Sequence, residues 1–158
     1  MKCPTLIKWT GSKRHIAEQI IEHFPKSIDT YYEPFLGGGS VFLRLLSTSK
    51  ISVNHFVLSD LNKSLIEIFK TVKDDPQRLI DSYSEQWNSL QRDGEFYYKQ
   101  REAFNKTKNP LIFYFLTRTC YNGTIRFNRH GDFNVGFHFG RKGMEPKKLK
   151  ISLIIILI

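Results

Sequence analysis

Three consecutive glycines and a later acid are the residues of this chain best suited to chemistry. Gly37, Gly38 and Gly39 lie between the run YYEPFL and the apolar run VFLRLL, and Asp60 ends the run FVLSD. A glycine turn between a strand and a helix lets the backbone approach a ligand closely. An acid about 20 residues further on can bind the ribose of an adenosine-type cofactor. A glycine-rich loop without a ligand is the alternative, and the spacing of Asp60 favours the cofactor site.

The residues around the glycine turn exclude two common nucleotide motifs. A dinucleotide-binding turn has a third glycine at the position that Phe42 occupies here. A P-loop has a lysine after its last glycine, whereas Ser40 follows here. The Gly-Ser-Lys segment at 11–13 lacks the upstream glycine of such a loop. The turn therefore suits an adenosine ligand without a pyrophosphate, which favours S-adenosylmethionine over NAD or ATP.

A second region, from Thr117 to Gly143, interleaves arginines, phenylalanines and amide side chains. Turn residues at 122–123 and 130–132 predict a hairpin with arms at 124–129 and 133–139. Arginine binds guanine edges through two hydrogen bonds and asparagine binds adenine similarly, while further cations hold phosphates. The phenylalanines alone would indicate core, but the polar residues between them favour a nucleic-acid-binding surface. These phenylalanines are Phe127, Phe133, Phe137 and Phe139.

The net charge supports a polyanionic partner. The chain has 158 residues and a net charge of +9. Residues 105–150 hold ten basic and two acidic residues, so this segment carries +8 of the total. One-sided clustering of this kind is typical of nucleic-acid binding, with a basic surface that serves only solubility as the alternative.

Length and composition limit the classes of protein to which the chain can belong. The length fits about one domain, and 41% apolar residues favour a globular chain. Two cysteines form no disulfide framework, which indicates a reducing, cytoplasmic setting. No signal peptide is expected. No membrane association is expected either, because the apolar end ISLIIILI is far shorter than the roughly 20 residues that span a bilayer.

The patterning predicts an α/β chain with two strands, both in its first part. We expect a short strand or extended lead-in at 6–10, strands at 31–33 and 55–59, and helices at 13–24, 40–46, 62–73, 76–90, 95–105 and 110–120. Asn62 is a candidate N-cap. The layout predicts a nucleotide-binding half-sheet with an inserted helical subdomain and a basic hairpin.

Four segments in this order resemble a known family, the Dam-type (D12 class) DNA adenine-N6 methyltransferases. They are KWTGSK (8–13), EPFLGGGSVF (33–42), SDLN (59–62) and CYNGTIRFNRHGDFNV (120–135). Thr10 stands where alanine is commoner in the family, and Gly136 stands where proline is usual. The resemblance runs from about Lys8 to Lys150. It implies a Rossmann-like domain that uses S-adenosylmethionine and an inserted helical and hairpin subdomain that recognises duplex DNA.

The resemblance also implies roles for single residues. Trp9 and Lys13 would contact the cofactor, Asp60 would accept hydrogen bonds from the ribose, and the residues Phe35, Gly37 and Gly39 would line the pocket. Arg126 resembles the family's guanine reader, and Asn122 and Thr124 stand where relatives contact bases. Structural alternatives are a core Trp9, a surface Lys13 and a plain turn at Asn122. The residues expected at DNA are Asn122, Thr124, Arg126, Asn128, Arg141 and Lys142.

The chain departs from the family at its catalytic motif. The resemblance calls for Asp-Pro-Pro-Tyr beyond Lys150, to hold N6 of a flipped adenine, and the 158 residues contain no such motif. We therefore expect a methyltransferase cut short or frameshifted before this motif, with no catalytic residue of its own and little activity alone. The alternatives are a non-catalytic remnant that binds DNA and cofactor, one half of a split enzyme with a separately encoded C-terminal half, and a basic nucleic-acid-binding module unrelated to methylation. The expected parts are 1–73 (cofactor domain), 74–143 (recognition domain) and 144–158 (tail).

Overall fold

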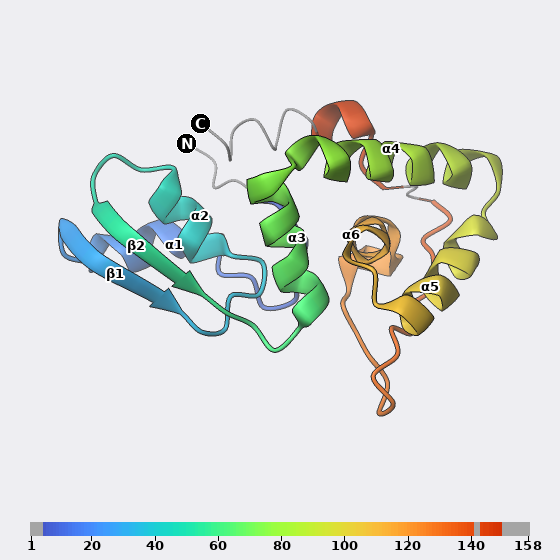
Figure 1. The fold of residues 1–158 in the computed structure, drawn as a ribbon, viewed down its shortest axis with the longest axis horizontal. Helices are drawn as coiled ribbons and strands as arrows, with labels where there is room; N and C mark the ends of the chain where they lie inside the picture. Colours follow the sequence, from blue (N-terminus) through green and yellow to red (C-terminus); the bar gives the residue numbers. More distant parts are fainter. Residues whose placement is uncertain (1–4, 141–142, 150–158) are drawn as a thin grey trace.

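The computed structural model describes residues 5–140 and 143–149 as a mixed α/β fold (Figure 1). The expected positions Arg141 and Lys142, and the apolar tail at 151–158, lie outside the described residues. The first part of the chain contains α1 (Ala17–Glu22), β1 (Ser27–Glu33), α2 (Ser40–Leu46) and β2 (Ser52–Leu58). The second part contains α3 (Lys63–Asp74), α4 (Pro76–Arg92), α5 (Phe96–Thr107), α6 (Pro110–Thr119) and the 3₁₀ turn η1 (Tyr121–Gly123).

The two strands form a parallel sheet of which one face is covered. Tyr31 pairs with Phe56 and Tyr32 pairs with Val57. Phe56 packs edge-on against Phe42 of α2, with ring centroids 5.2 Å apart. The opposite face is open, because the side chains of Tyr32 and Val57 are 67% and 46% exposed. Parallel sheets are ordinarily covered on both faces, so this sheet lacks one of its layers within the described residues.

The helices of the second part surround α6. Figure 1 shows α6 end-on, with α3, α4 and α5 arranged around it. All residues from Phe113 to Thr119 are buried. The helix starts are well specified, because Asn62, Asp75 and Asn109 each accept a hydrogen bond from a backbone N–H of the first turn.

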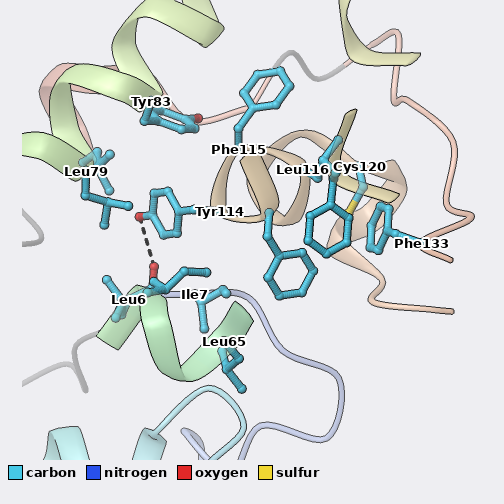
Figure 2. Packing of buried hydrophobic residues seen from close by; sticks show 14 of the residues in the cluster. Leu6, Ile7, Leu65, Leu79, Tyr83, Tyr114, Phe115, Leu116, Cys120 and Phe133 are labelled. Carbon is cyan, nitrogen blue, oxygen red and sulfur yellow. Dashed lines mark hydrogen bonds between the residues drawn. The ribbon is translucent and has the colours of Figure 1, made fainter. Parts of the chain in front are cut away.

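The segment before the first helix joins the two parts of the molecule. Leu6 and Ile7 are each 1% exposed and belong to the same core as α6. The hydroxyl of Tyr114 donates to the carbonyl of Leu6 at 3.2 Å, as Figure 2 shows. The predicted lead-in is therefore a buried connector, although it forms no strand.

The structure corrects several expected boundaries. The first helix begins at Ala17 instead of Lys13, because residues 10–11 and 14–16 form turns and the Lys13 N–H donates to the side chain of Ser40. The predicted hairpin has no regular strands; only isolated bridges join Phe127 to Phe133 and Cys120 to Phe137. No helix in the described part of the chain has the length and apolar character needed to cross a bilayer.

Candidate functional site

The glycine triplet forms a tight turn between β1 and α2. Gly37 and Gly39 have φ angles of 52° and 64°, a region that only glycine enters at low cost. The N–H of Gly39 donates to the Leu36 carbonyl at 2.8 Å. The N–H of Leu36 donates to the Ser59 carbonyl at 2.9 Å, which fastens the turn to the end of β2.

Asp60 holds this turn from the end of β2. Its Oδ2 accepts from the N–H of Gly37 at 2.8 Å, and its Oδ1 accepts from the N–H of Asn62 at 3.0 Å. An ionised carboxylate has roughly four acceptor sites, so it retains acceptor capacity for further donors. The structure thus brings together two motifs that the sequence separates by more than 20 residues. They meet at the carboxyl ends of parallel strands, where α/β sheets bind ligands.

Trp9 packs directly on the turn. A Cβ placed on Gly37 would lie 2.9 Å from Cδ1 of the indole, so a larger residue at 37 would displace the ring. The opposite contact of Trp9 is edge-on to Phe113, with ring centroids 6.4 Å apart. Trp9 therefore packs against the core and against the glycine turn, and a contact between Trp9 and the cofactor stays a prediction.

The backbone of Lys13 lies beside the turn, whereas its side chain is exposed. The N–H of Lys13 donates to Oγ of Ser40 at 3.0 Å, and Ser40 is the first residue of α2. The structure therefore brings the Lys13 backbone to the start of the helix that follows the glycines.

Two large apolar side chains on the loops around Asp60 are exposed. Phe35 is 88% exposed and Leu61 is 98% exposed. They lie on loops that touch through the hydrogen bond between Leu36 and Ser59. Phe35 was predicted from the sequence and Leu61 was not, although an apolar residue directly after the acid was the available signal.

Glu33 is a second residue that the sequence did not single out as functional. Its Oε2 accepts from the hydroxyl of Tyr31 at 3.0 Å and from the N–H of Phe42 at 3.1 Å. Burial raises the pKa of Glu33 above its ordinary value, against the opposing effect of these two hydrogen bonds. A carboxyl group with weakened acidity thus lies at the base of the glycine turn.

The turn η1, which precedes the predicted hairpin, contacts the segment KWTGSK. A Cβ on Gly123 would lie 2.6 Å from Cδ of Lys8, so the two loops are in van der Waals contact. Two cavities flank this contact. One of about 450 Å³ is lined by Trp9, Asn122 and Thr124 among others. The other, of about 590 Å³, is lined by Lys8, Asn122 and His138 among others.

A buried cation contributes to the larger cavity. Arg118 of α6 is 8% exposed and lines this cavity together with Lys8. Its hydrogen bonds within the described residues go to neutral oxygens: the Tyr114 hydroxyl at 3.3 Å, the Thr5 carbonyl at 3.3 Å and the Leu6 carbonyl. The cavity therefore has a positive wall.

The hairpin presents some of its predicted site residues to solvent and uses one in its turn. Thr124 and Arg126 are exposed. Oδ1 of Asn128 accepts from the N–H groups of His130 and Asp132, both at 2.9 Å. Asn128 therefore has a structural function in closing the turn, whatever its amide nitrogen contacts.

The phenylalanines of this region are mainly core. Phe133 and Phe137 are 1% and 5% exposed, Phe127 packs against the same core, and Phe139 is 69% exposed. Between Phe133 and Phe137 the outer surface is formed by residues between the rings, as alternation along an extended chain requires, and Phe139 is the exposed ring.

Comparison with known proteins identifies the family of the chain. Residues 9–154 match the model of the D12 class N6 adenine-specific DNA methyltransferases. The chain is 40% identical over 154 residues to the Type II methyltransferase M.MjaIII of Methanocaldococcus jannaschii, covering 87% of this chain and 53% of that protein. It is 34% identical over 145 residues to the DNA adenine methylase of Escherichia coli, covering 89% and 50%.

A third relative gives the same picture. The DNA adenine methylase of Haemophilus influenzae is 31% identical over 146 residues, which cover 87% of this chain and 48% of that protein. The chain thus spans about half the length of the curated relatives it matches. Because the family model matches most of its residues, the chain belongs to the D12 class N6 adenine-specific DNA methyltransferases.

Proposed function

We propose that the protein serves in site-specific transfer of a methyl group from S-adenosylmethionine to N6 of adenine in duplex DNA. One observation carries the proposal: the hydrogen bond between Asp60 and the Gly37 N–H, which joins the glycine turn to an acid at the carboxyl edge of a parallel sheet. When bound, the cofactor supplies an electrophilic methyl group. The residues of this chain would bind and orient both reactants.

Cofactor binding would use groups on both sides of Asp60. The free acceptor sites of this carboxylate suit ribose hydroxyls. The exposed side chains of Phe35 and Leu61 suit the faces of an adenine ring. The glycines at 37 and 39 permit close backbone approach. Trp9 and Lys13 would contact the methionine part of the cofactor.

DNA binding would use the basic second part of the chain. The exposed residues Asn122, Thr124 and Arg126 would read bases, and surplus cations, including Arg141 and Lys142, would hold phosphates. The contact between Gly123 and Lys8 supports coupling of the two functions, because it brings the reading loop next to the cofactor segment. The two cavities at this contact offer room for an extruded base.

In this proposal the sheet is part of a Rossmann-like cofactor domain, residues 1–73, into which a recognition domain, residues 74–143, is inserted. Residues 144–158 would form the tail. Duplex DNA as substrate, together with the few cysteines, suits a cytoplasmic location.

Turnover would require residues outside these 158. No Asp-Pro-Pro-Tyr motif occurs among them, so nothing here would hold N6 of the adenine. We propose that a polypeptide segment carrying this motif, in the same chain or encoded separately, covers the open sheet face at Tyr32 and Val57. The missing motif also supports a second candidate function, a non-catalytic protein that binds DNA and cofactor.

Calorimetric titration of the chain with S-adenosylmethionine tests the cofactor site. Asp60→Ala should lower the affinity at least tenfold, because it removes the ribose acceptor and frees the turn. Asp29→Ala is the matched control, since this exposed acid of β1 bonds only Thr30 and Asn54 within the described residues. Equal affinity for wild type and Asp60→Ala would refute the cofactor assignment.

A methylation assay on duplex DNA with labelled cofactor tests turnover. We expect little product from the chain alone and product when the Asp-Pro-Pro-Tyr half of a relative is added. Multiple turnover by the chain alone would refute the need for that half. Binding of cofactor and DNA, without product under either condition, would establish the non-catalytic alternative.

A further inference from the structure

The hairpin has an inner and an outer face, and the outer face holds a specific polar pair. Phe133, Val135 and Phe137 point into the core, whereas Arg126 and Asn134 are exposed. The N–H of Asn134 donates to the carbonyl of Arg126 at 3.2 Å, so the two residues lie opposite each other. On the outer face, Nε of Arg126 donates to Oδ1 of Asn134 at 3.0 Å.

This hydrogen bond determines which edge of the guanidinium remains available. An arginine side chain has five N–H donors, one on Nε and four on the two terminal nitrogens. With Nε bound to Asn134, the terminal pair is left to face an external ligand. Guanine presents two adjacent acceptors, O6 and N7, and arginine binds them through two parallel hydrogen bonds. The terminal pair has the matching geometry.

The arm that carries Asn134 is fixed from behind by α5. The amide of Asn105 donates to the carbonyl of Phe133 at 3.1 Å and accepts from its N–H at 2.8 Å. The hydroxyl of Tyr97 donates to the carbonyl of Val135 at 2.9 Å. Both neighbours of Asn134 are therefore held by a helix, so its own position is rigid enough to orient a partner.

We propose that Asn134 is a positioning residue for base reading: it binds Nε of Arg126, so that the terminal guanidinium nitrogens are oriented to donate hydrogen bonds to guanine. This inference rests on the proposed function, since it assumes that the hairpin reads DNA. Without Asn134 the arginine keeps its charge and its attraction to phosphates but samples more rotamers. Guanine preference then falls while general DNA affinity changes little.

Selection from a randomised duplex library, followed by sequencing of the bound fraction, tests this inference on the full chain. The wild type should enrich sites with a guanine that Arg126→Ala no longer selects. Asn134→Ala should lower the enrichment of that same guanine about threefold to tenfold, the range that one hydrogen bond supports, and leave other positions unchanged. Asn134→Asp keeps an acceptor for Nε and should restore the guanine preference.

Arg129→Ala is the control, because this exposed cation at the hairpin turn should alter affinity evenly across sequences. Circular dichroism confirms that each variant is folded. If Asn134→Ala keeps the full guanine preference while Arg126→Ala loses it, the positioning role is wrong and base reading stands. If the wild type enriches no sequence, base reading by the hairpin is wrong and the positioning role falls with it.

Discussion

The sheet region and the helical region of this molecule bury their apolar residues very differently. The seven bulkiest fully buried side chains are all aromatic and lie between residues 83 and 133. Of the large hydrophobic side chains that are exposed among the described residues, six precede residue 62: Ile16, Tyr32, Phe35, Leu46, Val57 and Leu61. In the helical region Tyr121 and Phe139 are the two exposed large hydrophobic side chains among the described residues, so this region buries its apolar residues more fully than the sheet region does.

This difference in burial is consistent with a binding partner for the sheet region, as we propose above. A pair of strands on its own is marginally stable in water, and a parallel pair ordinarily has both faces covered. Among the described residues, the helices around α6 bury their apolar faces against one another. The sheet region presents apolar residues on its open face and around Asp60, where we propose that the missing half and the cofactor bind.

The largest expected effect is the loss of stability on truncating a buried ring of the helical region, compared with truncating an exposed residue of the sheet. Phe113 is fully buried and stacks on Phe104 at 4.8 Å, so Phe113→Ala should lower the free energy of unfolding by about 3–5 kcal/mol. Val57→Ala on the open face should cost less than about 1 kcal/mol. Urea denaturation measures both. Equal costs would mean that the open face is already covered, by self-association for example.

A second prediction compares glycines from the two regions. Gly39 and Gly131 both have positive φ, 64° and 80°. A Cβ on Gly39 would lie 2.9 Å from the ring of Phe69, whereas Gly131 has open space within 4 Å. Gly131→Ala should therefore cost only the backbone strain, about 1–2 kcal/mol, and Gly39→Ala should cost about 1 kcal/mol more. Thermal denaturation measures the difference; a larger loss at Gly131 would contradict the packing at the turn.

A third prediction concerns pH and the base of the glycine turn. Because burial raises the pKa of Glu33, the folded chain holds this proton more tightly than the unfolded chain does. The stability from this group is complete below the ordinary pKa of 4.5 and is lost as the pH rises through the raised pKa. Glu33→Gln should remove this decline.

Urea denaturation at a series of pH values between 4 and 8 measures the effect as the difference in unfolding free energy between Glu33→Gln and wild type. As the pH rises, the unfolding free energy of Glu33→Gln should increase relative to that of the wild type. Glu102→Gln, a change at an exposed position of α5, controls for the loss of one negative charge. A pH-independent difference would show that Glu33 has the same proton affinity in both states.

The smallest expected effect is the reaction of a buried thiol in the helical region. Burial raises the pKa of Cys120 to about 11, and its side chain is 4% exposed. In a Cys3→Ser background, a thiol reagent at pH 8 should react with Cys120 very slowly in buffer. The reaction should accelerate in parallel with unfolding in urea. Rapid reaction in buffer would reveal local opening and contradict the completeness of this core.

The sequence predicted those elements whose ends carry their own signals. Asn62 was expected as an N-cap, and its side chain accepts from Leu65 N–H. Pro76 and Pro110 begin α4 and α6 as expected. The start of the first helix was wrong because Lys13 bonds to Ser40, a contact between distant residues that no local pattern contains.

The candidate site was predictable where spacing alone identifies it. The glycine turn and Asp60 were found in this way and lie in contact. Glu33 and Leu61 were missed, because the altered pKa of one and the exposure of the other follow from tertiary packing. The inner and outer faces of the hairpin could be predicted from the alternation of apolar and other residues at 133–137. The hydrogen bonds from Asn105 of α5 to this arm could not be predicted, because no sequence pattern marks Asn105 as a partner of Phe133.

The bond between Leu6 and Tyr114 also constrains how the chain folds during synthesis. It joins residues 108 positions apart, so Leu6 has no native partner there until α6 has left the ribosome. At about 5–20 residues per second, this wait lasts roughly 5–20 seconds. The apolar side chains of Leu6 and Ile7 therefore lack their packing against α6 for that time.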